Sequence, residues 1–305
     1  MPDLARELCW RHADAHLRAQ PLDTQKARYA LEPLVNLARL LIRAGEGEEA
    51  YRLLDRLNQA VYARADATID GRFVSFRDLL LHGQDHHALH QWLWTVLLGD
   101  GTRALVTAQQ WQNARAHVRQ SKGVGLRLLD GRQIEIVATC LGGDPRAAQQ
   151  TVLDSTPVEH WEKAIASCLI ALCLSAAGED LAGAAQQVTQ AYMSLEPVPA
   201  LAVFRQRIGL IALAFTGAHG RDQIARRLVR DAARSGDGYA AKEVLEDATC
   251  TEIMSSSDCD KLTTTVEAAG LATGSMPLHL EQALLEVVDA AVATIMAHVD
   301  GREPS

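Results

Sequence analysis

Several helix pairs of this chain can be phased on one repeat template, and the clearest copy lies near the N-terminus. In that copy, apolar and small residues fall at helical spacing on both sides of a glycine: Leu34, Leu37, Ala38, Leu41, Gly45, Ala50, Leu54 and Leu57. Two such stripes joined by a break are typical of a helix–turn–helix repeat of roughly 34 residues. Repeats of this kind stack into curved scaffolds that usually bind a partner on the concave face. The pattern thus constrains the architecture, but it names neither a reaction nor a ligand.

Further copies are degenerate but share one small residue at the point where the two helices meet. The residues equivalent to Ala50 are Ala114, Ala147, Ala184 and Ala225. Their intervals are close to one repeat, except that the first leaves room for an insertion. The alternative is an irregular all-α bundle whose helix pairs have similar lengths.

Composition favours helices packed closely against one another. Of 305 residues, 48% are hydrophobic and only 5% are aromatic, whereas a β-sandwich would need more Val, Ile, Tyr and Phe. We therefore expect an all-α fold, a right-handed superhelix of antiparallel helix pairs. Because a solenoid has no single core that limits its size, we expect one domain over residues 1–305. Its parts are an N-terminal helix (1–20), repeat 1 (22–66), an insertion (67–85), further helix pairs (86–235), and C-terminal helices with a cap (236–300).

The insertion carries a turn signal. Asp70-Gly71 lies between Ile69 and Phe73, and Asp-Gly between apolar residues predicts a short β-hairpin. An insertion in a repeat often projects from the binding face, so the hairpin could cover one end of a groove. The alternative is a surface loop whose phenylalanines pack on neighbouring helices.

Charge and hydropathy argue against a nucleic-acid-binding, a secreted and a membrane-spanning protein. The net charge of −8 argues against a nucleic-acid partner. No apolar signal region opens the chain, and its longest apolar run is too short to span a bilayer. We therefore expect a cytoplasmic protein without a membrane partner.

Two histidines after the insertion have the spacing of a metal-binding pair. His86 and His90 are four residues apart, which places both on one helix face where they could chelate Zn²⁺. The HExxH motif of zinc proteases is absent, and a third ligand would have to come from elsewhere. We expect solvated or partly packed histidines and no cofactor. A metal-dependent enzyme using this pair stays an alternative.

Trp92 and Trp94 follow the histidines. Being two residues apart, they point in different directions from a helix, so one can enter the core while the other faces a groove or the hairpin. This arrangement favours a second alternative, a small-molecule-binding or regulatory protein. It predicts a closed apolar pocket near residues 66–95, with the hairpin as its lid.

The segment from Leu34 to Leu57 resembles the tetratricopeptide-repeat (TPR) family. It departs from the family pattern at Leu34, Leu41 and Tyr62, where the large first aromatic residue, the usual Tyr and the closing Pro would stand. IDGRFVSF and WLWTVLLGDGTRAL are also similar to segments of uncharacterised actinobacterial helical proteins, some of them linked to specialised-metabolite gene clusters.

The TPR resemblance implies which residues line the groove, because the first helix of each pair does so in that family. The implied groove residues are Asn36, Arg39, Arg43, Arg103 and Arg132. Arginine suits carboxylates through its planar fork, so the resemblance implies a groove for an acidic peptide. The alternative is that these arginines pair with Glu32, Glu46 or Asp100.

Together these observations predict a non-catalytic scaffold or adaptor that binds a protein or peptide. The last helix, from Pro277, is amphipathic. It is expected to cap the array, and its alternative role is dimerisation of the chain.

Overall fold

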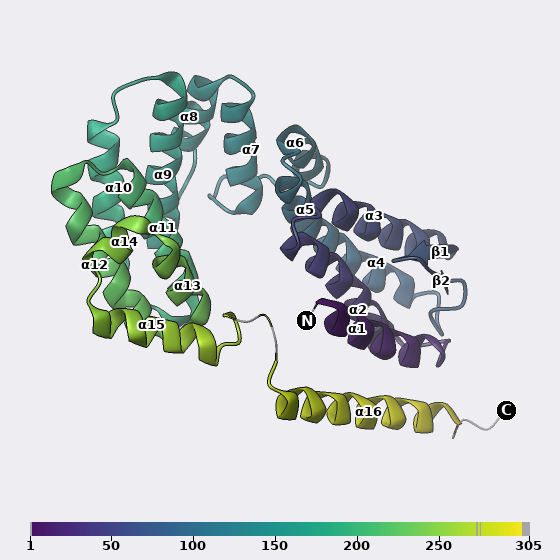
Figure 1. Cartoon of the computed structure of the whole chain (residues 1–305). Helices are drawn as coiled ribbons and strands as arrows, with labels where there is room; N and C mark the ends of the chain where they lie inside the picture. The colour runs from purple at the N-terminus through teal and green to yellow at the C-terminus, as the bar shows by residue number, and fades with distance from the viewer. Residues whose placement is uncertain (1, 273, 275, 301–305) are drawn as a thin grey trace. The chain divides into compact units, whose positions relative to one another are not determined.

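Over the residues that it describes, the computed structural model is all-α apart from one β-hairpin, which confirms the predicted all-α class (Figure 1), whereas a right-handed superhelix stays a prediction. It describes residues 2–272, 274 and 276–300, without the side chains of 218, 219 and 298–300. The chain divides into two compact units. The first comprises Met1–Ser121 and Met276–Ser305, and the second is Lys122–Ser275. That the whole chain acts as one domain stays a prediction.

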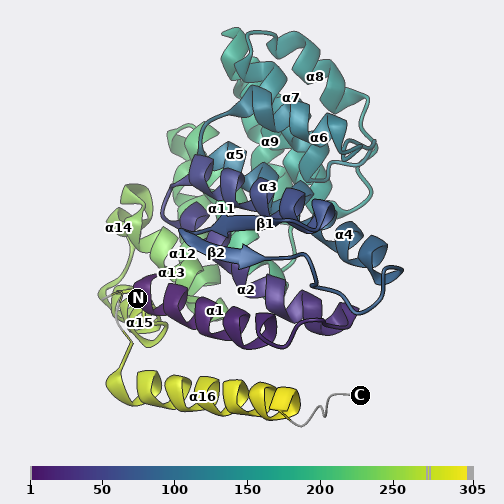
Figure 2. The same ribbon diagram turned by 90° about the vertical axis from the view of Figure 1, so that its right-hand side faces the viewer.

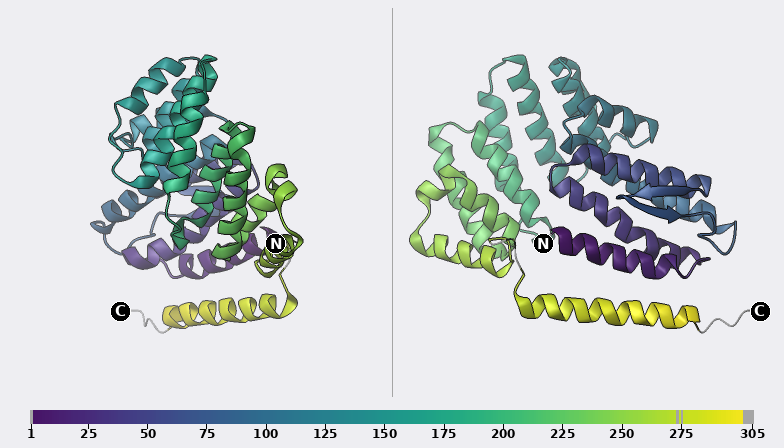
Figure 3. Two further views of the ribbon diagram at one scale, coloured as in Figure 1. Left: turned by 90° about the vertical axis from the view of Figure 1, so that its left-hand side faces the viewer. Right: turned by 45° about the vertical axis from the view of Figure 1, so that its right-hand side comes forward.

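The first unit is built on the expected helix pair. Its helices are α1 (Pro2–Leu17), α2 (Thr24–Arg43), α3 (Gly47–Ala63), α4 (Asp85–Val96), α5 (Thr102–Thr107), α6 (Trp111–Gln120) and α16 (Leu278–Asp300), with a π-helical turn at Leu97–Gly101. Asp23 caps α2 by accepting a hydrogen bond from the backbone N–H of Lys26 at 2.8 Å. Leu34, Leu54 and Leu57 are buried between α2 and α3, so the stripe seen in the sequence forms the core. α1, α2 and α3 lie side by side in this order (Figure 3).

The predicted hairpin is confirmed, and it is tied to α1. Strands β1 (Asp66–Ile69) and β2 (Arg72–Ser75) pair antiparallel, with Asp70 and Gly71 at the turn, and β1 lies against α3 (Figure 2). Asp70 accepts hydrogen bonds from the side chains of Arg6, at 2.8 Å from Nε, and Trp10, at 2.9 Å. The hairpin therefore stays fixed to the first helix of its own unit.

Helix α16 lies against α1 on only one side (Figure 1). Arg11 of α1 forms an ion pair with Asp289. Apolar side chains of α16 stay exposed, Leu280 by 49% and Val287 by 66%. Dimerisation through these side chains stays a prediction.

The second unit is a stack of helix pairs. Its helices are α7 (Asp130–Leu141), α8 (Pro145–Leu153), α9 (His160–Ala177), α10 (Ala182–Ser194), α11 (Ala202–Phe215), α12 (Ala218–Ser235), α13 (Gly238–Glu246), α14 (Ala248–Ile253) and α15 (Ser256–Ala268), with a 3₁₀ turn at Pro199–Leu201. Consecutive helices pack from α7 to α14, and α13 also packs on α15 (Figure 3). The first helices of successive pairs also touch, α7 with α9, α9 with α11 and α11 with α13.

One glycine permits the close approach within the α11–α12 pair. A Cβ atom added to Gly209 of α11 would lie 2.5 Å from Leu228 Cδ2 and 2.7 Å from the Tyr192 ring. Both neighbours are buried. Any larger side chain at position 209 must therefore push α12 or α10 away.

A buried carboxylate, that of Glu162, lies in the first turn of α9. The Glu162 side chain accepts hydrogen bonds from Arg127 Nε at 3.1 Å and from the backbone N–H groups of Leu128 and Glu159, each at 3.2 Å. The hydrogen bond from Arg127, followed by the two backbone N–H groups and the Arg127 charge, lowers the pKa of Glu162 to about 2 against the opposing effect of burial.

One template position was wrong by a single residue. Ala147 is exposed and its neighbour Ala148 is fully buried. Asp144 caps α8 by accepting a hydrogen bond from Ala147 N–H at 3.0 Å, and Pro145 is the first helical residue. This early start turns Ala148, rather than Ala147, toward α7 and α9.

Among the described helices, none combines the length and the apolar character needed to cross a bilayer.

Candidate functional site

Three of the residues implied to line a groove meet around one buried carboxylate of the first unit. Arg39 Nε donates to Asp100 at 2.9 Å, and its Nη1 donates to Glu32 at 2.7 Å and to Asn36 Oδ1 at 2.9 Å. Arg103 Nη1 also donates to Asp100, at 3.4 Å. Arg39 therefore pairs with Glu32 and Asp100, and Arg103 pairs with Asp100, as the alternative in the sequence analysis expects. Both guanidinium groups already have carboxylate partners within the chain. Their role in binding a peptide stays a prediction.

The remaining two arginines differ in their surroundings. Arg43 is half-exposed and forms no ion pair with a described residue. Arg132 belongs to the second unit, where it donates to Ser155 Oγ at 3.1 Å and to the Thr151 carbonyl at 3.0 Å. The structure therefore does not gather the five implied residues in one site of either unit.

Trp92 and Trp94 face different directions, as their spacing predicts. Trp92 is half-buried under the Arg28 guanidinium, 5.3 Å from the ring centroid, whereas Trp94 is 40% exposed. One hollow lined by residues of the 66–95 segment together with α3 is about 40 Å³ in volume, far below the 300–1,000 Å³ usual for small-molecule sites. Another, beside the hairpin turn and α3, is about 290 Å³, but charged side chains such as Arg6, Glu49 and Asp70 line it, so it is not the apolar pocket that this alternative predicts.

His86 and His90 share contacts with Tyr62 of α3. The His86 Nε2–H group donates to the Val61 carbonyl at 3.0 Å, and the His90 ring lies 4.8 Å from the Tyr62 ring. Burial, followed by the neighbouring histidines, lowers the pKa of His90. In the part of the chain that the structure describes, no group of three or more His, Cys, Asp or Glu side chains is placed to hold a metal ion.

The structure shows a different cationic site on α12 of the second unit. Ile224, Ala225 and Leu228 are fully buried and hold α12 against its neighbours, and the helix ends at Gly236, whose φ of +64° favours glycine. Four-residue spacing places Arg226, Arg230 and Arg234 in a row along the exposed side. We call these three residues the arginine row. It spans about 12 Å, at 1.5 Å of rise per residue.

The arginine row has no internal partner. None of its three side chains forms an ion pair or a hydrogen bond with another described residue. Like charges four residues apart destabilise a helix by about 0.2–0.5 kcal/mol for each pair. Two such pairs follow one another here, at 226/230 and 230/234. No ion pair with a described carboxylate offsets the repulsion between these arginines.

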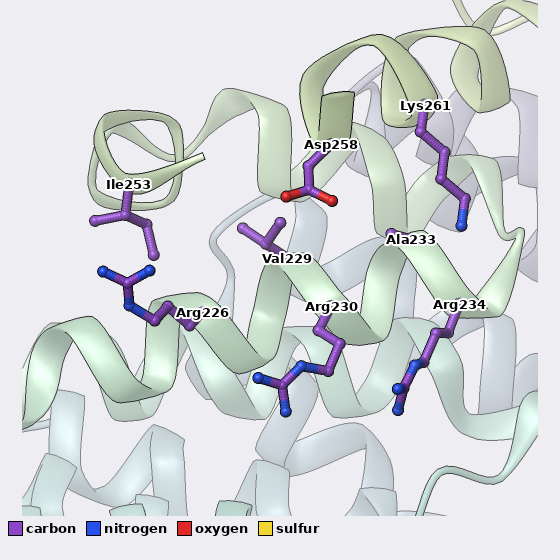
Figure 4. A pocket seen from close by; sticks show the side chains of 8 residues that line it. All are labelled: Arg226, Val229, Arg230, Ala233, Arg234, Ile253, Asp258 and Lys261. Atoms are coloured by element: carbon purple, nitrogen blue, oxygen red, sulfur yellow. The ribbon is translucent and has the colours of Figure 1, made fainter. Parts of the chain in front are cut away.

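Two hollows flank the arginine row. The first, of about 360 Å³, lies between α12 and α14–α15 and is lined also by Val229, Ala233, Ile253, Asp258 and Lys261. The second, of about 420 Å³, is lined also by Met193, Pro197, Arg205, Gln223, Arg227 and Asp231. In Figure 4, Arg226 extends toward Ile253, whereas Arg230 and Arg234 point away from Asp258. The row therefore separates a flank of aliphatic side chains from a flank rich in arginine.

A buried network fixes α12 beneath the second hollow. Asp231 accepts hydrogen bonds from Arg205 Nη2 at 2.6 Å and Arg227 Nε at 3.3 Å. Arg227 Nη2 also donates to the Leu195 carbonyl at 2.8 Å, and its guanidinium lies 5.0 Å from the Tyr192 ring centroid. These contacts occupy Asp231, the acidic residue nearest to Arg230 and Arg234 along α12. The positive charges of the arginine row thus have no ion-pair partner among the described residues, and the helix that carries them is held in place by this network.

Two buried polar atoms near this hollow have no partner. Arg205 is 5% exposed and lines the hollow, yet its Nε–H group has no hydrogen-bond acceptor among the described residues, and the same holds for the Tyr192 hydroxyl. Burial, followed by the charge of Asp231, raises the pKa of Tyr192, so the hydroxyl keeps its proton. Both atoms are buried, so it is the excess of guanidinium groups over carboxylates among the side chains that line the hollow that favours an anionic ligand.

Sequence reasoning missed this site, although one signal was present. Arginine recurs every four residues from 226 to 234, which is visible in the sequence alone. The TPR resemblance directed attention to the first helix of each pair, whereas α12 is the second helix of its pair. Comparisons with protein-family models, curated proteins and solved structures found no match to this chain.

Proposed function

We propose that this protein is a TPR-like helical-repeat scaffold that binds an acidic protein segment along the arginine row, without catalysing a reaction. The observation that carries the proposal is the row itself: three arginines that have no ion-pair partner among the described residues and lie between two hollows. The contacts between successive first helices in the second unit support the repeat architecture. A right-handed superhelix and a cytoplasmic location are part of the proposal.

A protein ligand suits the site better than a nucleic acid. Besides arginines, the two hollows are lined by aliphatic residues, Met193, Gln223, Lys261 and two aspartates, and no described aromatic residue lines either of them. Single-stranded nucleic acids are usually held by aromatic side chains on which the bases stack. Arginine paired with carboxylate is a charge-assisted contact that needs no such platform.

The test is a fluorescence-anisotropy titration of the full-length chain with a labelled octapeptide of glutamate at low salt. If each exposed pair contributes about 0.2–1 kcal/mol, the triple variant Arg226→Gln/Arg230→Gln/Arg234→Gln should bind roughly tenfold more weakly than wild type. The matched control, Arg146→Gln/Lys163→Gln/Arg221→Gln, removes three exposed charges of the second unit outside the row and should bind like wild type.

Equal weakening in both triple variants would show that net charge, not this site, attracts the peptide, and the proposal would fail. An octamer of deoxythymidine that binds more tightly than the peptide, and that also depends on the row, would replace the protein ligand by a nucleic acid.

A further inference from the structure

Two histidines of α1 lie together on one side of that helix, in the unit that does not carry the arginine row. His12 and His16 are four residues apart, and their ring centroids lie 5.1 Å from one another, with an angle of 42° between the ring planes. Side chains at this spacing share one face of a helix, where two imidazoles can bind one metal ion. The pair thus has the arrangement that a metal site requires of its first two ligands.

His16 is buried without a hydrogen-bond partner for its ring. The residue is 7% exposed, and its ring nitrogens form no hydrogen bond with another described residue. Tyr29 contacts it through the ring, at 6.0 Å between centroids. Buried polar side chains usually have a hydrogen-bond partner. A metal ion held between His12 and His16 would give this imidazole the partner that the chain does not.

The separation of the two rings matches that of two imidazoles on one zinc ion. A Zn–N bond is about 2.0–2.1 Å long, and the centre of a five-membered ring with bonds of about 1.33 Å lies about 1.1 Å from each atom. At the tetrahedral angle of about 109°, two such rings have centroids roughly 5.1–5.3 Å apart. The observed 5.1 Å agrees, so the side chains already have the separation that the ion requires.

The other histidine pair at this spacing, His86 and His90 of α4, is arranged differently. Both rings contact the Tyr62 ring, and among the described ring contacts none joins one histidine to the other. The His86 Nε2–H group is also occupied by the Val61 carbonyl. The pair on α1 is therefore the better placed of the two.

The surroundings of His12 and His16 suit a metal ion as well. Burial lowers the pKa of His12, and burial, followed by the charges of His12 and Lys26, lowers the pKa of His16 to about 4. Both rings are therefore neutral near pH 7, the form that binds a metal. His12 also lines a hollow of about 240 Å³ between α1, α2 and α16, which has room for several water molecules of about 30 Å³ each.

We infer that His12 and His16 form a site for a divalent transition-metal ion of the kind that imidazole prefers, with Zn²⁺ as the first candidate. The two imidazoles supply two ligands. In the part of the chain that the structure describes, no group of three or more His, Cys, Asp or Glu side chains is placed to hold a metal, so water from the adjoining hollow completes the coordination. Two protein ligands hold an ion less firmly than the four of a structural zinc site, and binding is reversible.

The test is isothermal titration calorimetry of the full-length chain, without an affinity tag, with Zn²⁺ alone. His12→Asn/His16→Asn should weaken Zn²⁺ binding at least tenfold, because loss of even an outer partner of a ligand costs about 10–100-fold in metal affinity. The matched control, His86→Asn/His90→Asn, removes two histidines at the same spacing and should bind like wild type. Zn²⁺ should also raise the Tm of wild type and of the control, because only the folded form holds the site.

Several outcomes would overturn the inference: no Zn²⁺ binding by wild type, equal affinity in wild type and His12→Asn/His16→Asn, or a loss of equal size in the control. If circular dichroism shows that the double variant does not fold, His12→Asn alone decides, because that position is exposed. A tenfold loss of affinity in this single variant supports the site, and unchanged affinity refutes it.

Discussion

Replacing the central arginine of the row should weaken binding and stabilise the fold at the same time. Arg230 has a like charge four residues away on each side, and it has no ion-pair partner in the described structure. Arg230→Gln keeps a good helix former at the position and removes two repulsive pairs. At about 0.2–0.5 kcal/mol per pair, the gain in stability is about 0.4–1 kcal/mol.

The same substitution removes one contact to an acidic ligand, worth about 0.2–1 kcal/mol for an exposed pair. The dissociation constant should rise by a factor between about 1.4 and 5. The opposite signs matter, because a purely structural arginine would lose stability when replaced, and a merely solvated one would leave the dissociation constant unchanged.

The assay is urea unfolding of the full-length chain at low salt, followed by circular dichroism, with amide hydrogen exchange of α12 as the local readout. For a domain of 150–250 residues, the gain corresponds to a rise in Tm of about 1–4 °C. At 1 M salt the gain should disappear, because the Debye length shrinks to about 3 Å.

The control repeats Arg230→Gln in a background that carries Arg226→Gln and Arg234→Gln, where the two repulsive pairs within the row are gone and only Arg227, three residues away, remains. The substitution should then stabilise the fold by clearly less than it does in the wild-type background. An equal gain in that background, or a loss of stability in the wild-type background, would refute the reasoning.

Other predictions concern the salt dependence of binding and the packing of the second unit. Affinity for the all-glutamate octapeptide should fall steeply between 0.05 M and 0.5 M salt, since exposed pairs are screened; a salt-independent affinity would contradict the arginine contacts. The pKa of Glu162 lies near 2 rather than its ordinary 4.5, so its stabilisation is complete above pH 4.5 and declines as pH falls toward 2. Glu162→Gln should flatten the dependence of unfolding on pH in that window, and an unchanged profile would be the contrary result. Gly209→Ala should destabilise by about 1–3 kcal/mol because Leu228 and Tyr192 leave no room. Gly183→Ala, which meets open space, should not destabilise, and equal losses would contradict the packing argument.

Helical spacing of apolar residues predicted the helix pair of the first unit, and a turn signal predicted the hairpin. The stripe from Leu34 to Leu57 specifies α2 and α3 because its members face one another across the turn. The Asp70-Gly71 turn identified the hairpin for a local reason, the backbone conformation it requires. The template placed Ala147 wrongly because the cap residue Asp144 sets where α8 begins. A degenerate repeat template does not show the position of such a cap.

The candidate site was less predictable because it depends on which charges neutralise one another. Arg39 looks available in the sequence, yet Asp100, 61 residues further along the chain, folds against it. Asp231 looks like a partner for Arg230, yet it is taken by Arg205 and Arg227 from another side. The pairings of Arg39 with Asp100 and of Arg205 with Asp231 are long-range and cannot be read from local spacing. The arginine row was identified only because the structure shows that these three arginines form no ion pair with a described residue.

The most direct test of the central claim is a charge exchange between the row and its ligand. Titration of the variant Arg226→Glu/Arg230→Glu/Arg234→Glu with the all-glutamate octapeptide should show no binding, and an octapeptide of lysine should bind this variant more tightly than it binds the wild type. Retention of glutamate-peptide binding by the reversed row, or failure of the lysine peptide to gain affinity in a variant that stays folded, would contradict the account.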